Sequence, residues 1–252
     1  MSRIEDIFSN HKKALMPFLV AGYPSIESTE SAIIAMDEAG AAIIEIGIPF
    51  SDPIADGPVI TAAMHEALEN GVTPEHAFCV VAKIRAQVSA GLIAMVSDSI
   101  VRRNGRNAFL NRLTEAGFDG IIIPDIDDLD AVNVSAYCSK CGITFSMLVS
   151  PTTPTKRIEW LSSISTGFLY ILARVGLTGE QSSPPDITSR IAEIRALTDL
   201  PLAVGFGIST REHVESVTQF ADAAIVGSAL VRRMSNADNP SEAARKFVCE
   251  LS

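Results

Sequence analysis

Short apolar runs alternate with longer amphipathic stretches eight times along this 252-residue chain. The apolar runs lack the strict apolar–polar alternation of half-exposed strands, which is typical of parallel strands buried on both faces. The pattern therefore predicts eight buried, parallel strands, at 15–20, 42–46, 92–96, 120–123, 144–149, 168–172, 202–204 and 223–226.

Amphipathic helical patterns fill most of the intervals between these strands. They are predicted at 25–39, 74–89, 106–116, 128–141, 155–163, 186–197 and 211–220, with an extra N-terminal helix at 4–11 and a closing helix at 240–251. Eight β-then-α units in a chain of this length predict a single (β/α)₈ TIM barrel over residues 1–252, with a mobile loop at 173–186 after strand six. A doubly wound open sheet is the structural alternative.

The composition excludes several classes of function. The chain has a formal net charge of −10, which argues against non-specific binding to nucleic acid. No apolar run reaches membrane-spanning length, and the N-terminus lacks the apolar core of a signal peptide, so the expected location is cytoplasmic. Cys138 and Cys141 have redox-motif spacing but lie late in a predicted helix, which favours reduced, structural cysteines.

Two carboxylates flank a stiff loop after the second strand. Glu45 lies among isoleucine and alanine side chains, and Asp56 follows on a segment with three prolines. A buried glutamate either finds a partner or has its pKa raised. Two carboxylates in different environments suit general acid–base chemistry. The alternative is purely structural: a capping aspartate, and a strand-end glutamate bonded to backbone.

In a (β/α)₈ barrel the active site lies at the carboxyl ends of the strands, and phosphate groups bind beside the last two. Glycines 205 and 207 follow strand seven, and Gly227 with Ser228 opens the helix after strand eight, where backbone N–H groups can hold an oxyanion. One such turn alone is only a tight turn, but two turns at these places predict a phosphate site. Gly179, in the loop after strand six, can supply a further amide.

Two kinds of barrel chemistry are not expected. All lysines and all four histidines fall in predicted helices or near the N-terminus, where we expect the histidines on solvated helix faces. A Schiff-base lysine or a set of metal ligands would be needed at the strand ends. Cofactor-free and metal-free acid–base chemistry on a phosphorylated substrate is therefore predicted, with Asp125 and Tyr170 also placed near the strand ends.

These motifs together resemble the α subunit family of tryptophan synthase, from the first strand to the eighth. The residues that carry the resemblance are Pro17-Phe18, Ala21-Gly22-Tyr23-Pro24, Glu45-Ile-Gly-Ile-Pro-Phe-Ser-Asp-Pro-Ile-Ala-Asp56-Gly-Pro, Gly71-Val72-Thr73-Pro74, Gly176-Leu-Thr178-Gly179, Gly205-Phe-Gly-Ile-Ser209 and Gly227-Ser228-Ala229.

The resemblance implies retro-aldol cleavage of indole-3-glycerol phosphate to indole and glyceraldehyde 3-phosphate. Glu45 matches the family's general acid–base residue, and Asp56 matches the carboxylate that accepts the indole N–H. Other roles are also carried over by resemblance: Thr178 bonds Asp56 when the loop after strand six closes, Tyr170 supports the site, Phe18 lines the indole pocket, and Gly179, Gly207, Gly227 and Ser228 contact the phosphate.

The resemblance also implies a partner, a β subunit in an α₂β₂ heterotetramer that receives the indole and carries pyridoxal phosphate. Three segments depart from the family pattern. Ser97-Asp98-Ser99 replaces Tyr-x-Asn, Asp127 replaces the second proline of Pro-Asp-Leu-Pro, and Val175 replaces a small or polar residue. The first two belong to the face that usually contacts the β subunit, so we expect a re-tuned interface, and Asp127 would weaken a partner or demand a basic one.

Three other functions remain open from the residues. One is a free-standing indole-releasing lyase, which differs only in needing no partner. The second is another phosphosugar barrel isomerase or epimerase, against which the spacing of Glu45 and Asp56 argues. The third is a non-enzymatic activator of a β subunit, which has no need of either carboxylate.

Overall fold

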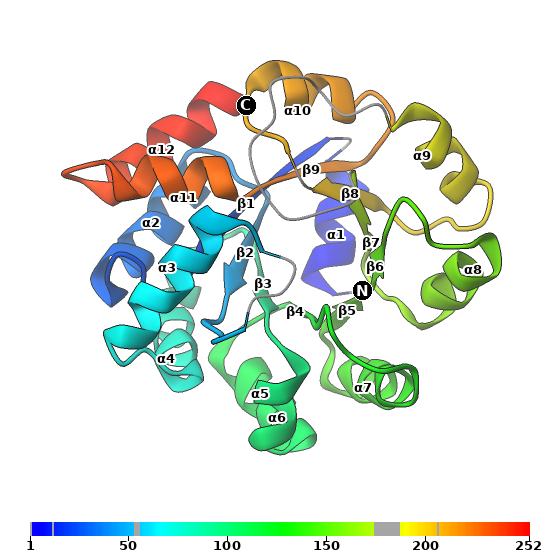
Figure 1. Ribbon diagram of the computed structural model, residues 1–252, viewed down its shortest axis with the longest axis horizontal. Helices are drawn as coiled ribbons and strands as arrows, with labels where there is room; N and C mark the ends of the chain where they lie inside the picture. Colours follow the sequence, from blue (N-terminus) through cyan, green and yellow to red (C-terminus); the bar gives the residue numbers. More distant parts are fainter. Residues whose placement is uncertain (1, 12, 53–55, 174–186, 206) are drawn as a thin grey trace.

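A computed structural model describes residues 2–11, 13–52, 56–173, 187–205 and 207–252. Nine strand segments form one sheet, and every strand pair in it is parallel (Figure 1). The segments are β1 (Ala14–Val20), β2 (Ile43–Gly47), β3 (Gly91–Met95), β4 (Gly120–Ile122), β5 (Thr144–Ser146), β6 (Leu148–Val149), β7 (Leu169–Leu172), β8 (Leu202–Gly205) and β9 (Ala223–Val226).

The sheet closes on itself. Its strand order is β5-β4-β3-β2-β1-β9-β8-β7-β6, and the two end segments are consecutive in the chain with only Met147 between them. The carbonyl of Met147 accepts the N–H of Tyr170 at 3.0 Å, which continues the ladder across this gap. β5 and β6 are therefore one interrupted strand, at the predicted 144–149. The predicted eight-stranded (β/α)₈ barrel is confirmed, and the open doubly wound sheet is wrong.

The helices lie around the outside of the barrel, except the first, which lies within the ring of the others in this view (Figure 1). They are α1 (Arg3–Asn10), α2 (Ile26–Glu38), α3 (Pro58–Glu69), α4 (Pro74–Ile84), α5 (Asp98–Arg103), α6 (Arg106–Ala116), α7 (Asp128–Cys141), α8 (Thr155–Ile164), α9 (Thr188–Arg195), α10 (Arg211–Val217), α11 (Ser228–Ser235) and α12 (Pro240–Leu251), with a short 3₁₀ turn at Arg85–Gln87. The predicted helices are present, whereas α3 and α5 were not expected as elements. The sequence before α3 is rich in proline and glycine, which favoured a loop there. α5 has only six residues, which is too short for a clear helical pattern.

Two apolar layers stabilise the barrel. The larger lies between the strands and the outer helices. A smaller cluster fills the barrel interior, with Met16, Ile93, Ile122, Tyr170 and Ile225 among its members. Each strand is thus buried on both faces, which explains why the sequence showed unbroken apolar runs rather than alternation.

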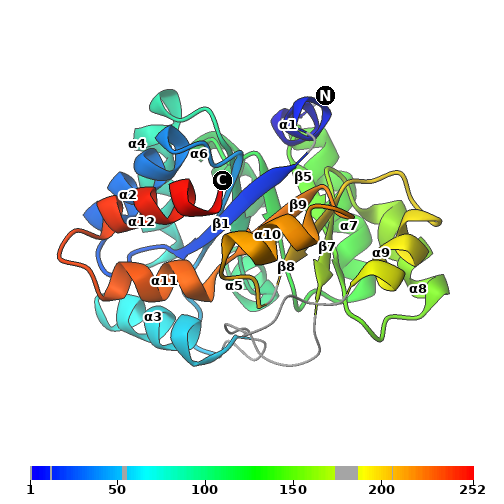
Figure 2. The same cartoon turned by 90° about the horizontal axis from the view of Figure 1, so that it is seen from above.

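Helix α1 covers the amino-terminal end of the barrel, and Figure 2 shows it at one end of the molecule with α3 towards the other. Its Ile4 is fully buried and belongs to the interior cluster. A Cβ on Gly91 or on Gly167 would meet the Ile4 side chain at 2.5 and 3.2 Å, so these glycines leave room for it. The predicted extra N-terminal helix therefore closes the end of the barrel opposite to the candidate active site.

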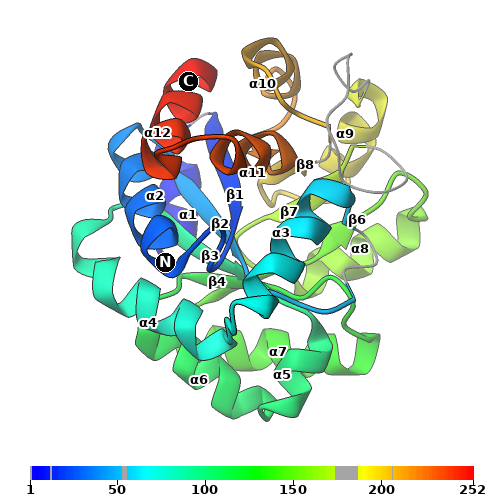
Figure 3. The same cartoon turned by 60° about the vertical axis from the view of Figure 1, so that its left-hand side comes forward.

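Helix α3 follows the loop that carries Asp56 and packs against α11 and β1 at the carboxyl end of the barrel (Figure 3). The predicted loop 173–186 lies almost wholly outside the described residues. In the described part of the chain, no helix is both long enough and apolar enough to cross a membrane.

Candidate active site

Glu45 lies in the middle of β2 with its side chain fully buried. The strand register places it beside Phe18 of β1 and Ile93 of β3. Neither carboxylate oxygen has a hydrogen-bond partner among the described residues. The structural alternative, a glutamate bonded to backbone, is therefore wrong within the described chain. An unpartnered buried carboxyl group destabilises the fold, which is typical of a group retained for its chemistry.

Burial raises the pKa of both carboxyl groups, and that of Glu45 more than that of Asp56. Loss of hydration, and after it the negative charge of Asp56, raises the pKa of Glu45 to about 8. Burial raises the pKa of Asp56 to about 6. At pH 7, therefore, Glu45 is mostly protonated and Asp56 is mostly ionised. The pair holds one acid and one base at neutral pH, as an acid–base site requires.

Asp56 lies just before α3 and is half-buried. The N-cap residue of this helix is Gly57, and Pro58 occupies its first turn. Among the described residues, Asp56 is bonded to the start of this helix through its backbone carbonyl, which accepts the Thr61 hydroxyl at 3.3 Å. The alternative in which Asp56 caps the helix is wrong, and its carboxylate is not committed to the helix start.

Tyr170 points into the barrel interior from β7 and is 5% exposed. Burial, with smaller contributions from Glu45 and Asp56, raises its pKa well above the ordinary value, so its hydroxyl stays protonated. A Cβ on Gly205 would lie 2.5 Å from that hydroxyl oxygen. Gly205 therefore makes room for Tyr170, and the expected approach of its backbone N–H to a phosphate stays a prediction.

Phe18 forms an apolar wall on β1, next to the strand that carries Glu45. Its ring belongs to a cluster with Ile60 and Met64 of α3. A Cβ on Gly47 would meet the ring at 2.6 Å, and one on Gly227 would meet it at 3.4 Å. The aromatic ring therefore lies between the end of β2, which carries Glu45, and the start of α11.

Three further apolar residues at strand ends were not singled out from the sequence. Met95, Leu148 and Leu172 lie at or near the carboxyl ends of β3, β6 and β7 and are only partly buried against the interior cluster. Their position near the end of an apolar strand run was the available signal. They are candidates for the wall of a pocket for an aromatic ligand.

The turns after β8 and β9 have the backbone features of an anion site. Gly207 has φ +83°, a conformation that favours glycine. Gly227 is the N-cap of α11 without a side-chain cap, and Ser228 begins that helix nine-tenths buried. The first turn of α11 therefore presents N–H groups and the positive end of a helix dipole. Gly179, a predicted phosphate contact, lies outside the described residues, and so does Thr178, which was predicted to bond Asp56.

Asp125, after β4, is held in a structural role. Its carboxylate accepts the Ser97 hydroxyl at 2.7 Å and the Asp98 N–H at 2.8 Å. Asp127, the acid in place of a proline, is the N-cap of α7 and accepts the Asp130 N–H at 3.0 Å. Two of the three departures from the family pattern, Ser97-Asp98-Ser99 and Asp127, are thus neighbours in space, at the turns after β3 and β4.

All four histidines were expected on solvated helix faces, and this is wrong for His213. His65 and His76 are exposed on helices, but His213 is only 4% exposed, because it lies in the first turn of α10 against the turn after β8. Within the described residues no three His, Cys, Asp or Glu side chains gather as metal ligands do.

The barrel and this pair of carboxyl groups define an enzyme class: a (β/α)₈ barrel with acid–base groups at the carboxyl ends of its strands. The sequence model of the family described as "Tryptophan synthase alpha chain" matches residues 4–252. The chain belongs to this family and is a lyase of tryptophan biosynthesis. The family reaction cleaves indole-3-glycerol phosphate to indole and glyceraldehyde 3-phosphate, and the indole goes to a β subunit.

Individual relatives agree over the full length. The chain is 37% identical to the tryptophan synthase alpha chain of Bacillus cereus over all of this chain and 95% of that protein. It is 39% identical to that of Prochlorococcus marinus over 94% of this chain and 86% of that one. Among solved structures, a mutant alpha-subunit from Pyrococcus furiosus superposes with a TM-score of 0.88 at 34% identity, covering 94% of this chain and 97% of that chain. Tryptophan synthase from M. tuberculosis gives 0.89 at 29% identity, covering 100% and 98%.

Proposed function

We propose that Glu45 and Asp56 are the acid–base pair that cleaves indole-3-glycerol phosphate in this chain. Glu45 is fully buried, mostly protonated at neutral pH and without a hydrogen-bond partner among the described residues, so it can give its proton to carbon 3 of the indole ring. Asp56 is ionised at the same pH and can accept the indole N–H. Its negative charge stabilises the positive charge that develops on the ring nitrogen.

The bond between indole carbon 3 and the glycerol chain then breaks. Its electron pair returns to the ring and neutralises the nitrogen, which restores the aromatic indole. The hydroxyl on the leaving carbon gives its proton to Glu45, now a carboxylate, and that carbon becomes the aldehyde of glyceraldehyde 3-phosphate. Glu45 ends protonated, as it began, so one residue serves both proton transfers.

The rest of the site binds and orients the substrate. Phe18 supplies an apolar face for the indole ring, and Tyr170 supports the carboxyl pair with a hydroxyl that stays protonated. Gly207, Gly227 and Ser228 would hold the phosphate through backbone N–H groups and the α11 dipole. By resemblance, Gly179 adds a phosphate contact and Thr178 bonds Asp56.

We also propose an assembly and a setting for the reaction. The chain acts as one domain, pairs with a β subunit in an α₂β₂ heterotetramer, and works in the cytoplasm. It needs no cofactor or metal of its own, and pyridoxal phosphate belongs to the β partner. Support for this comes from membership of the family.

The single observation that carries the proposal is the fully buried Glu45 carboxyl group, unpartnered among the described residues and beside a second carboxyl of lower pKa. The test is indole release from indole-3-glycerol phosphate by the purified chain, with and without a cognate β subunit. Slow release that rises with the β subunit is expected. Fast release by the chain alone would identify a free-standing lyase, and no release in either case would refute the proposal.

A further inference from the structure

A cluster of charged residues joins the turns after β3 and β4. Asp98, in the first turn of α5, has a side chain only 7% exposed. Its carboxylate lies 3.4 Å from the Arg106 guanidinium of α6 and 3.6 Å from that of Arg102. The same Arg106 nitrogen also bonds Asp130 of α7. Arg106 is therefore the residue that connects α5, α6 and α7.

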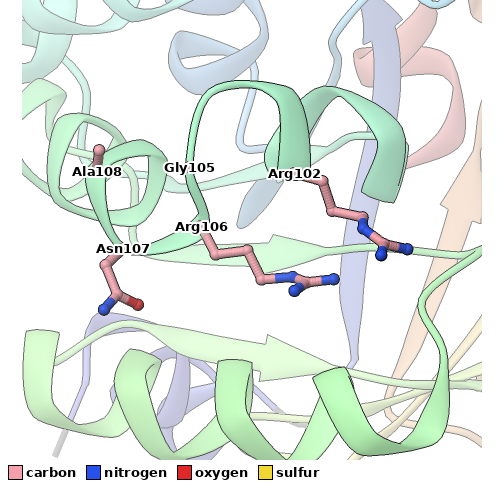
Figure 4. A pocket seen from close by; sticks show the side chains of 5 residues that line it. All are labelled: Arg102, Gly105, Arg106, Asn107 and Ala108. Carbon is pink, nitrogen blue, oxygen red and sulfur yellow. The ribbon is translucent and has the colours of Figure 1, made fainter.

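Figure 4 shows the two arginines. Their side chains extend in the same direction from the end of α5 and the start of α6, along an open cavity of about 560 Å³. Arg102 is 59% exposed, but Arg106 is only 25% exposed and its Nε has no partner among the described residues. Arg106 is thus the more buried of the two arginines, and it contacts two carboxylates, those of Asp98 and Asp130.

The cluster is continuous with the frame of the active site. Asp125 accepts the Asp98 N–H and the Ser97 hydroxyl, so it fixes the turn that immediately follows β3. Just before that turn, the carbonyl of Met95 accepts the Ile48 N–H at 2.9 Å. Ile48 begins the segment that leads from Glu45 to Asp56. Met95 is the last residue of β3, so it is this strand that pairs with the base of the loop that carries Asp56, and the turn holds the end of the strand.

The cluster holds more negative than positive charge. Three carboxylates face the two arginines, from Asp98, Asp127 and Asp130, and Asp125 lies next to Asp98. The positive charges of Arg102 and Arg106 help to hold the pKa of Asp127 below its usual range, after its hydrogen bonds with Asp130. The arginines pair with Asp98 and Asp130, whereas Asp127 is exposed at the start of α7. The expectation that Asp127 weakens a partner or demands a basic one stays a prediction.

We infer that Arg106 is a positioning residue for the reaction: through Asp98 and Asp125 it holds the turn after β3, and with it the base of the Asp56 loop. The inference rests on the proposed function. Arg106 acts on turnover without touching the substrate, because it keeps a buried carboxylate charged and in place at the rim of the barrel.

Loss of Arg106 has a specific pH signature. Burial raises the pKa of Asp98, with a smaller push from Asp125, and Arg106 and then Arg102 oppose that rise. Without Arg106, ionised Asp98 is a buried charge with one weak partner, whereas protonated Asp98 is tolerated. The damage should therefore be greatest at high pH and smaller at low pH.

The experiment measures kcat and KM for indole release at pH 6 and pH 8, together with thermal stability, for four variants. These are Arg106→Gln, Asp98→Asn, the double variant, and Arg112→Gln as a matched control. Arg112 lies on the same helix and pairs with Glu75 and Glu115 at the surface, away from the turn. We expect Arg106→Gln to lower kcat about tenfold at pH 8 and by less at pH 6, each relative to the unmodified chain at that pH.

The double variant should recover most of the lost kcat and show no pH dependence of the ratio, because removing both charges leaves nothing buried and unpaired. Arg112→Gln should leave kcat unchanged. If Arg106→Gln does not fold, Arg106→Lys keeps the charge and should show a smaller deficit in the same direction. An unchanged kcat with lowered thermal stability, or an equal deficit at both pH values, would overturn the inference. An unmodified chain that releases no indole would refute the proposed function first.

Discussion

Glu45 illustrates how one residue can weaken a fold and serve its chemistry. Its carboxyl group is fully buried in an apolar strand and has no hydrogen-bond partner among the described residues. The resulting rise of its pKa to about 8 makes it a proton donor at neutral pH. Asp56, at about 6, stays a base a short distance along the chain. In the proposed function, this difference between the two environments gives the two carboxyl groups their separate roles.

The pH dependence of turnover should be bell-shaped. The reaction needs Asp56 ionised and Glu45 protonated, so kcat/KM should rise as pH increases through about 6 and fall as pH increases through about 8. A pH profile of indole release measures this directly. A profile that stays flat from pH 5 to pH 9 would remove both groups from the rate-determining proton transfers.

Glu45→Gln should lower indole release at least about 10³-fold, because glutamine cannot give a proton to the ring. Substrate binding should be largely kept, and calorimetry with the intact substrate can measure it on this inactive variant. A loss of binding equal to the loss of turnover would mean that Glu45 serves the structure of the pocket.

The same variant should become more stable than the unmodified chain at high pH. The folded-state pKa of Glu45 is raised from 4.5 to about 8, so the folded chain binds the extra proton between these values. The unmodified chain therefore loses stability as pH rises through that window. Thermal melting should show a higher Tm for Glu45→Gln at pH 8 and a nearly equal Tm at pH 4.5. Equal Tm values at both pH values would contradict the raised pKa.

Asp56→Asn should lower turnover about 10²-fold, a smaller loss than for Glu45→Gln. The amide oxygen can still accept the indole N–H, but it cannot stabilise the positive charge on the ring. The rise of kcat/KM near pH 6 should disappear as well. Near-normal turnover would exclude Asp56 from the mechanism.

At the scale of elements, the two ends of the barrel have separate tasks. The carboxyl ends of β2, β7, β8 and β9 gather the acid–base pair, Tyr170 and the glycine turns. The amino-terminal end is closed by α1, whose Ile4 fills the space left by Gly91 and Gly167. Changes at α1 should therefore affect stability and leave the chemistry intact.

Ile4→Ala should cost about 2–5 kcal/mol in the free energy of unfolding, because it leaves a cavity at a fully buried position. Ile7→Ala, at a partly buried position of the same helix, is the matched control and should cost less. Urea denaturation gives both values, and indole release by the folded Ile4→Ala variant should remain normal. A cost for Ile4→Ala no larger than that for Ile7→Ala would show that α1 does not close the barrel in this way.

At the scale of the whole molecule, closure of the sheet brings residues 18, 45, 170 and 227 to one mouth although they are spread over most of the chain. In the α5–α7 region, Arg102 and Arg106 pair with Asp98 and Asp130. Asp127 is exposed at the start of α7, where a basic group of a partner can reach it.

The chain and a cognate β subunit should therefore form a stable complex at ordinary ionic strength. Sedimentation of the mixture should show an α₂β₂ species, and indole release should increase in the same mixture. Asp127→Asn should weaken the binding of a β subunit that places a basic group opposite this residue, because it removes an exposed negative charge. Separate sedimentation of the two proteins at high concentration would refute the partnership.

The barrel could be predicted from the sequence, with the eight strand positions correct to within a residue or two, whereas the acid–base pair stays a prediction. Buried parallel strands leave unbroken apolar runs, and a glutamate inside such a run is visible without a structure. The packed fold was needed to show that Glu45 has no partner in the described chain, that Gly205 makes room for Tyr170, that His213 is buried, and that Arg106 joins Asp98 to Asp130. These facts depend on contacts between residues far apart in the chain or on the packing around one side chain, and hydrophobic periodicity carries no information about either.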